Sequence, residues 1–303
     1  MNHCTLCPRN CGANRSAGEA GYCGVAGEGI SGARAALHLW EEPCISGETG
    51  SGTVFFSGCP LRCVYCQNHQ IARAEVGRSI SVERLAEIFL ELAGQGAANI
   101  NLVTPTHYTP EIIRAVELAR KRGLSLPIVY NCGGYEKVET LRTLEGIVDI
   151  YLTDYKYSLR EPAARYSNAP DYPDVAAAAL AEMVRQTGRP VFDREGMLLR
   201  GTLVRHLLLP GQLKNAKEVV RQVYETYGDR AILSLMSQYT PLPQVAPWPE
   251  LDRRVTPEEY EALLDYALEL GVENAFIQEG DAAEESFIPA FDYKGWLSQE
   301  PSR

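Results

Sequence analysis

The sequence predicts an α/β fold built on a parallel sheet, with a small cysteine-rich extension at the N-terminus. From residue 53 onward, short apolar runs typical of strands alternate with amphipathic stretches typical of helices. The first 34 residues instead are rich in Gly, Cys and Asn and have no apolar period. Strands that alternate with helices form parallel sheets with right-handed crossovers. Such units make either an open doubly wound sheet or a partial barrel, and both bind ligands at the carboxyl ends of their strands.

The alternation defines the individual elements. The predicted strands are 53–57, 99–104, 127–131, 147–154, 202–209, 231–238 and 272–278. The predicted helices are 82–93, 110–122, 137–144, 175–186, 216–227 and 257–270. The last helix has a clear start, because Thr256 precedes Pro257 and is placed to form a capping box with Glu259.

The composition narrows the class of protein. The 303-residue chain has a net charge of −10, and an acidic chain without a basic stripe does not suit nucleic-acid binding. It has no apolar run long enough to cross a bilayer and no signal peptide, so we expect a cytoplasmic protein that does not bind membranes. Thiols stay reduced in that compartment, and nine cysteines therefore indicate metal binding or catalysis rather than disulfides.

A C-x3-C-x2-C motif follows the first predicted strand. Its members are Cys59, Cys63 and Cys66. A 4Fe–4S cluster usually has four thiolate ligands, so three closely spaced cysteines leave one iron open for a further ligand. The spacing alone fits a structural metal site equally well. Two features favour the open cluster: the loop lies at the expected ligand-binding edge, and the aromatic residue Tyr65 precedes the last cysteine.

The motif and its surroundings resemble one family along nearly the whole chain. The segments that carry the resemblance are 4–11, 41–43, 50–68, 101–107, 130–136, 154–156, 204–207 and 209–211. They are similar to radical S-adenosylmethionine (radical SAM) proteins of the pyruvate formate-lyase activating enzyme-like group that carry an N-terminal four-cysteine motif. The resemblance implies a partial (β/α)6 barrel of the radical SAM type.

The resemblance also implies a chemistry. The three cysteines would hold a 4Fe–4S cluster that reductively cleaves SAM to a 5′-deoxyadenosyl radical, which abstracts hydrogen from a substrate. A reductant such as flavodoxin or ferredoxin would supply the electron. The residues expected to contact the cofactor are Tyr65, Thr104, His107, Asn131, Asp154, Lys156 and Arg205. Many relatives end the second strand in Gly-Gly-Glu, which meets the SAM amino group, whereas this chain has Thr-Pro-Thr-His at 104–107. Thr104, Thr106 or His107 would take that role, and no catalytic side chain is predicted.

A second cysteine set lies in the N-terminal extension, residues 1–34, which we call the head; residues 35–303 are the predicted barrel. Cys4, Cys7, Cys11 and Cys23 have the spacing C-x2-C-x3-C-x11-C. Four thiolates suit either zinc or a second 4Fe–4S cluster. Zinc would fold a segment that lacks a core of its own, and a cluster would relay electrons.

Three functions remain at this stage. The preferred hypothesis is a radical SAM enzyme acting on a small molecule or short peptide, because the head and the proline-rich segment 240–249 are expected to narrow the barrel mouth. A glycyl-radical enzyme activase is the second. It would need an open barrel mouth to admit a folded partner enzyme, which is why it ranks below the first. A non-catalytic iron–sulfur electron carrier is the third.

Overall fold

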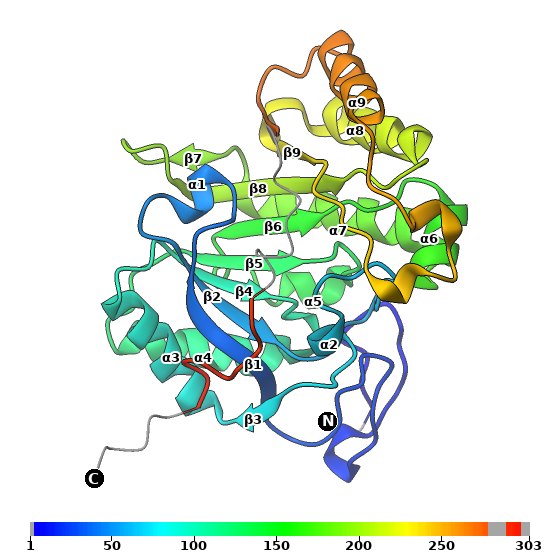
Figure 1. Ribbon diagram of the computed structural model, residues 1–303. Coiled ribbons are helices and arrows are strands. Elements are labelled where there is room, and N and C mark those ends of the chain that lie inside the picture. The colour runs from blue at the N-terminus through cyan, green and yellow to red at the C-terminus, as the bar shows by residue number, and fades with distance from the viewer. Residues whose placement is uncertain (1–2, 278–288, 298–303) are drawn as a thin grey trace.

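The computed structural model describes residues 3–277 and 289–297, and a curved sheet runs through its centre (Figure 1). The strands are β1 (Ile30–His38), β2 (Ser51–Phe56), β3 (Arg78–Ile80), β4 (Ile100–Val103), β5 (Ile128–Cys132), β6 (Ile150–Asp154), β7 (Val191–Phe192), β8 (Leu198–Leu207), β9 (Ile232–Met236) and β10 (Ala275–Ile277). The α-helices are α1 (Pro43–Ser46), α2 (His69–Ala72), α3 (Val82–Gly94), α4 (Thr109–Lys121), α5 (Val138–Arg142), α6 (Arg160–Ser167), α7 (Tyr172–Thr187), α8 (Leu213–Tyr227) and α9 (Pro257–Glu269).

The strand order confirms the predicted α/β fold with an open barrel. It is β10-β9-β8-β6-β5-β4-β2-β1-β3, with β7 paired to β8. The run from β2 to β10 is parallel, whereas β1 pairs antiparallel with β2 and β3 antiparallel with β1. Since the two ends of this order do not pair with each other, the sheet curves without closing.

All seven predicted strands are present, and β1, β3 and β7 are the ones that the pattern missed. The sequence of β1, Ile-Ser-Gly-Ala-Arg-Ala-Ala-Leu-His, has few residues that favour strands. It is a strand because Phe56 to Ser51 of β2 offer it a partner edge. The predicted boundary between residues 34 and 35 falls inside β1, so this strand joins the head to the barrel.

Two apolar cores lie between the sheet and the helices. In the first, Phe56 of β2 and Leu102 of β4 pack with side chains of α3 and α4 such as Phe89. In the second, strands β8 and β9 pack against α7, α8 and α9. These helices cover the convex face and leave the concave face of the sheet for other contacts (Figure 1).

Helix α1 closes one end of the concave face. Its Cys44 and Ile45 are buried in a third, smaller core with Val129, Leu152 and Leu203. Successive side chains of a strand point to opposite faces of the sheet. The strand residues of this third core point to the concave face, and their neighbours along each strand point to the convex face and the two large cores. A space therefore remains on the concave face between α1 and the carboxyl ends of the strands.

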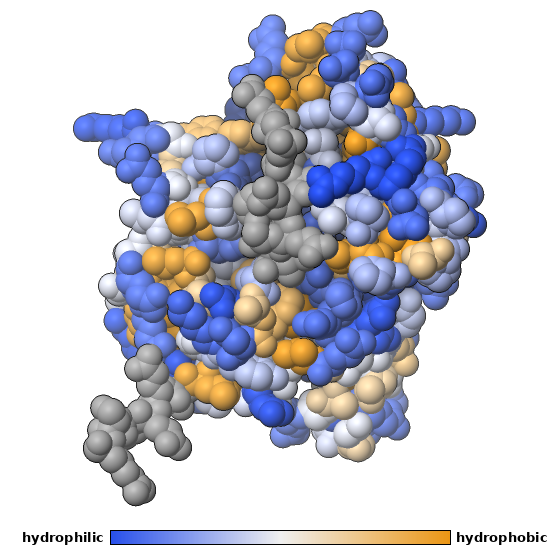
Figure 2. Space-filling view, in the orientation of Figure 1, coloured by the Kyte–Doolittle hydropathy of each residue, from blue (hydrophilic) through white to orange (hydrophobic). Residues whose placement is uncertain are grey.

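A membrane span needs a helix of sufficient length and apolar character. No helix in the described residues is both long and apolar enough to cross a bilayer. On the face shown in Figure 2, hydrophilic residues divide the coloured hydrophobic surface into separate patches.

Candidate active site

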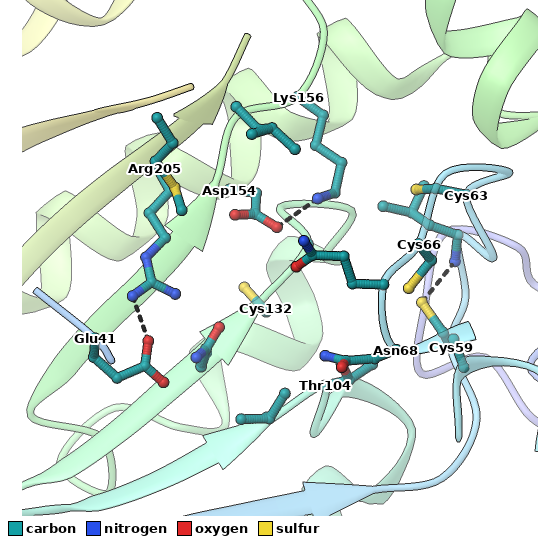
Figure 3. A pocket seen from close by; sticks show the side chains of 18 of the residues that line it. Glu41, Cys59, Cys63, Cys66, Asn68, Thr104, Cys132, Asp154, Lys156 and Arg205 are labelled. Carbon is teal, nitrogen blue, oxygen red and sulfur yellow. Dashed lines mark hydrogen bonds and ion pairs between the residues drawn. The ribbon is translucent and has the colours of Figure 1, made fainter. Parts of the chain in front are cut away.

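A cavity of about 540 Å³ occupies the concave face of the sheet. The cysteine loop forms one wall, and the carboxyl ends of β4, β5, β6 and β8 form another (Figure 3). The expected site residues that line it are Cys59, Cys63, Tyr65, Cys66, Thr104, Thr106, Asn131, Asp154, Lys156 and Arg205. A cavity of this size at the strand ends of an open α/β sheet is where such folds bind ligands.

The loop that follows β2 directs its three cysteines toward this cavity. Figure 3 shows Cys59, Cys63 and Cys66 gathered on one side of it. The backbone N–H of Leu61 points at Cys59 Sγ, 3.4 Å away, and the loop turns through Arg62 at a φ of 54°. A left-handed arginine is uncommon, and the reversal there brings the second and third cysteines back beside the first.

The thiols of this loop suit a cationic cofactor. Burial and, to a smaller extent, the neighbouring Cys63 raise the pKa of Cys59 to about 11. Burial and the same neighbour raise the pKa of Cys66 to about 12. Neighbouring buried thiols cannot all ionise unless positive charge compensates them, and iron provides it.

The donor set is compatible with a cluster. Among the described residues, no three His, Cys, Asp or Glu side chains stand close enough to enclose one metal ion. A 4Fe–4S cluster holds its thiolates farther apart, because each binds a different iron. Three cavity-facing cysteines on one loop therefore match a cluster with one open iron.

Lys156 lies over the cysteine loop and pairs with Asp154. The Nζ and Oδ2 atoms are 2.5 Å apart, and both side chains are partly buried. Burial opposes the charged form, yet the carboxylate of Asp154 and the thiolate of Cys63 raise the pKa of Lys156. Asp154 is the last residue of β6 and Lys156 lies two residues beyond it, and both line the cavity, as expected from their spacing (Figure 3).

The end of β4 carries unusual backbone. Thr104 has a φ of 58°, which is an outlier for a β-branched residue, and its N–H donates to the carbonyl of Asn131 at 2.8 Å. Strained residues of this kind cluster at binding sites. Thr104 and Asn131 both line the cavity.

His107 lies behind the cysteine loop and not in the cavity. It is 1% exposed, and its Nε2 is 2.7 Å from the carbonyl oxygen of Ser57. Burial lowers its pKa to about 4, so the imidazole is neutral. The candidates that remain beside the cavity for the SAM amino contact are Thr104 and Thr106.

Glu136 is a cavity residue that the sequence did not single out. Its carboxylate accepts from the Thr106 hydroxyl at 2.7 Å and from the Tyr130 hydroxyl at 3.2 Å. Burial raises its pKa to about 7. The residue was within the family-like segment 130–136, but nothing in its local pattern marked it as buried. It supplies a carboxyl group next to the end of β4, which lacks one of its own.

Arg205 lines the far end of the cavity, where two acidic residues already bind it. Its Nε donates to Glu42 Oε1 at 2.8 Å, and its Nη2 bonds both Glu41 and Glu42. Asn101 donates to Glu41 at 2.8 Å. The predicted contact between Arg205 and a cofactor carboxylate would therefore compete with this buried group.

The head packs against the back of the cysteine loop. Arg9 donates from Nε to the Pro60 carbonyl at 2.8 Å and from Nη2 to the Ser167 carbonyl at 2.9 Å. Its guanidinium also lies 4.0 Å from the ring centre of Tyr22 and 5.1 Å from that of Tyr135. One head side chain thus joins the loop to the end of α6.

The head cysteines approach one another around Gly21. A β-carbon at Gly21 would lie 3.2 Å from Cys11 Sγ and 3.5 Å from Cys23 Sγ. Burial raises the pKa of Cys7 to about 12 and raises that of Cys23. As in the cavity, such thiols need a cation to be held as thiolates.

The proline-rich segment 240–249 meets the loop from the other side. Gln244 donates to the Cys66 carbonyl at 3.1 Å, and Thr240 lines the cavity. The lining residues of the cavity begin at His38, so the head does not narrow it as predicted, whereas the proline-rich segment forms part of its wall.

The chain is similar to known proteins in sequence and fold. The family model of the radical SAM superfamily matches residues 53–222. The chain is 29% identical over 276 residues to uncharacterized protein MJ0674 of Methanocaldococcus jannaschii, which covers 88% of this chain and 75% of that protein.

Two solved structures share the fold. Methylornithine synthase (PylB) aligns with a TM-score of 0.50 and 15% identity over 74% of this chain and 72% of its own. HydG, a maturase of the FeFe-hydrogenase, aligns with a TM-score of 0.51 and 12% identity over 76% of this chain and 52% of its own. At these identities the likeness concerns the fold alone. Because the family model spans more than half of the chain, the protein belongs to the radical SAM superfamily.

Proposed function

We propose that this protein is a radical SAM enzyme that abstracts a hydrogen atom from a small molecule or a short peptide. Membership of the superfamily implies a 4Fe–4S cluster and SAM. The observation that carries the proposal is the set of three thiols on one loop, one buried and two partly buried, at a cavity at the strand ends. Cys59, Cys63 and Cys66 would hold three irons of the cluster.

The residues of the chain divide the remaining work. The cluster, held by Cys59, Cys63 and Cys66, would supply the one-electron reductive cleavage of SAM that leads to hydrogen abstraction from the substrate. Thr104, Thr106 and Asn131, which line the cavity, would bind polar groups of SAM, and Lys156 would place positive charge beside the thiolates. Buried walls such as Tyr65 exclude water from the reacting groups.

The size of the cavity favours a small substrate. Its volume of about 540 Å³ is within the range of small-molecule sites, and SAM must share it. The loop 39–42, the segment that begins at Thr240 and strand β10 all contribute wall residues. A folded partner would have to insert a loop between these segments, which supports a small molecule or short peptide over a glycyl-radical enzyme.

An electron carrier is less well supported than an enzyme. A carrier needs four protein ligands for each cluster, and no fourth cysteine follows Cys66 in the loop. The cavity beside the thiols has no purpose in a carrier. The proposal includes a cytoplasmic location and a flavodoxin or ferredoxin as electron donor, with neither nucleic acid nor membrane as partner.

The decisive experiment changes Cys59, Cys63 and Cys66 together to alanine. The anaerobically reconstituted and reduced wild type should convert SAM to 5′-deoxyadenosine, and the triple variant should not. The matched control is Cys44→Ala, which removes a buried thiol from the core around α1. Cleavage of SAM by the triple variant would refute the proposed function.

The substrate class has its own test. The reduced protein and SAM are incubated with a glycyl-radical enzyme from the same genome, and an electron paramagnetic resonance spectrum is recorded. We expect no glycyl doublet. A stoichiometric doublet would replace the small-molecule proposal with the activase function.

A further inference from the structure

Three buried hydroxyl groups connect the cavity wall to one of the cysteine sulfurs. The Ser167 hydroxyl donates to Cys63 Sγ at 2.9 Å. The Ser167 and Tyr157 oxygens are 2.8 Å apart and either can donate, whereas the Tyr157 hydroxyl donates to the Tyr65 oxygen at 2.8 Å. Ser167, Tyr157 and Tyr65 are 2%, 0% and 7% exposed, so water does not compete for these bonds. The chain of hydroxyls begins at Tyr65, which lines the cavity.

Counting hydrogens fixes the direction of this chain. Each hydroxyl has one hydrogen to donate, and the three links need one hydrogen each. A cysteine bound to iron is a thiolate and can only accept. Ser167 must then donate to Cys63, Tyr157 to Ser167, and Tyr65 to Tyr157. The structure has Tyr157 donating to Tyr65, so when Cys63 is a thiolate bound to iron the Tyr157 hydroxyl must turn to Ser167 and Tyr65 must become the donor.

The fold holds the last donor firmly in place. Ser167 is the final residue of α6, and the carbonyl of Tyr166 before it accepts from the N–H of Val64 at 2.9 Å. Arg9 binds the Ser167 carbonyl at 2.9 Å. The end of α6 is therefore fixed against the cysteine loop from two sides, which keeps the hydroxyl directed at the sulfur.

Hydrogen bonds to cluster sulfurs change reduction potentials. A donated hydrogen bond stabilises the more negative, reduced state of a cluster and so raises its potential. Bonds in a chain strengthen one another, and the effect should decline with distance from the sulfur.

Resting on the proposed function, we propose that Ser167 and Tyr157 are positioning residues that form a one-way hydrogen-bond chain from Tyr65 to Cys63 and raise the reduction potential of the catalytic cluster. Neither residue needs to touch SAM or the substrate. Tyr65 in the cavity wall is the far end of the chain, so a ligand that engages its hydroxyl would act on the cluster through it.

The test is a potentiometric titration of the reconstituted protein, followed by electron paramagnetic resonance. At a fixed ambient potential, Ser167→Ala should reduce the ratio of reduced to oxidised cluster about tenfold, a shift of about 59 mV for a one-electron couple. Tyr157→Phe should shift the potential in the same direction by less, and Tyr65→Phe by less again. The control is Ser158→Ala, because the Ser158 hydroxyl bonds the Asn215 carbonyl and not a sulfur.

The outcomes separate this inference from the proposed function. A wild type that binds no cluster at the three cysteines would contradict both the proposed function and the hydrogen-bond chain. A cluster that binds SAM but has the same potential in Ser167→Ala and wild type would overturn the hydrogen-bond chain alone. If Ser167→Ala does not retain its cluster, Tyr157→Phe decides: an unchanged potential in that variant overturns the chain, and a lower one supports it.

Discussion

The backbone N–H of Cys59 donates to the carbonyl oxygen of Cys23 at 3.3 Å. This bond joins the first cysteine of the catalytic loop to the last cysteine of the head. Gly58 makes the approach close enough, because a β-carbon there would lie 2.5 Å from Val25 Cγ2 and 3.0 Å from the Cys23 oxygen. The two cysteine sets are thus in direct backbone contact, although the sequence separates them by more than thirty residues.

This contact predicts a large effect of Gly58→Ala. The new methyl group would overlap Val25 and Cys23, and the backbone at a φ of 93° disfavours any side chain. We expect a loss of about 2 kcal/mol or more in the free energy of unfolding, as for overpacked sites, together with a lower iron content after reconstitution.

Gly96→Ala is the matched control for that variant. It has a similar φ of 87°, but nothing lies within 4 Å of the added carbon. It should cost only about 1 kcal/mol from backbone strain, with full iron content. Equal losses in the two variants would show that the contact between head and loop is unimportant.

The head should bind its own metal. Changing Cys7 and Cys11 together to alanine removes two of four thiolates in a segment that lacks an extended core. We expect elemental analysis to show that this metal is lost. The cluster at Cys59, Cys63 and Cys66 should still bind SAM. It should be released faster on exposure to a chelator, because Cys59 loses a rigid partner. A wild type with a single metal centre would contradict this prediction, whether the metal is zinc or iron.

Asp154 should contribute to SAM binding through Lys156. In Asp154→Ala the ammonium group loses its partner at 2.5 Å and is free to pair with the thiolates. We expect SAM to bind about tenfold more weakly or worse, given the roughly 1.5–3 kcal/mol of a hydrogen bond to a charged group. Isothermal titration calorimetry with SAM measures this affinity.

The control for Asp154 is Asp292→Ala. That change breaks a more exposed ion pair, with Arg34, on the other edge of the sheet. It should leave SAM affinity unchanged. Equal affinity for SAM in Asp154→Ala and wild type would show that the Asp154–Lys156 pair does not contribute to SAM binding.

The sequence predicted the parallel strands because their apolar runs are continuous and local, and it predicted the cysteine loop because spacing alone carries that signal. It missed β1, whose composition is weak and whose partner is supplied by β2. It also missed Ser167 and Arg9, because their roles depend on contacts across 104 and 51 residues with the cysteine loop. Arg205 was expected to be free for a ligand, and no local pattern could place Glu41 and Glu42 against it.

Glu136 predicts a pH dependence of stability. Burial raises the pKa of its carboxyl group from 4.5 in the unfolded chain to about 7 in the folded protein. Between these values the native state binds more protons than the unfolded state, so this group's contribution to stability falls as the pH rises from about 4.5 to 7. Glu136→Gln mimics the protonated form and should remove this part of the pH dependence. Relative to wild type, the variant should become more stable by up to about 3 kcal/mol between pH 5 and pH 8.

Anaerobic thermal unfolding at both pH values measures the difference, with Glu139→Gln as control. Glu139 is an exposed carboxyl group three residues further along the chain, so its removal should have the same small effect at both pH values. The Thr106 and Tyr130 hydroxyls donate to the two carboxylate oxygens of Glu136, and a hydroxyl can instead accept from a protonated carboxyl group or an amide N–H, which is why the Gln variant should still fold. If Glu136→Gln instead loses stability as the pH rises, then Glu136 is ionised in the native state and a cation, from the cofactor or the head, must lie beside it.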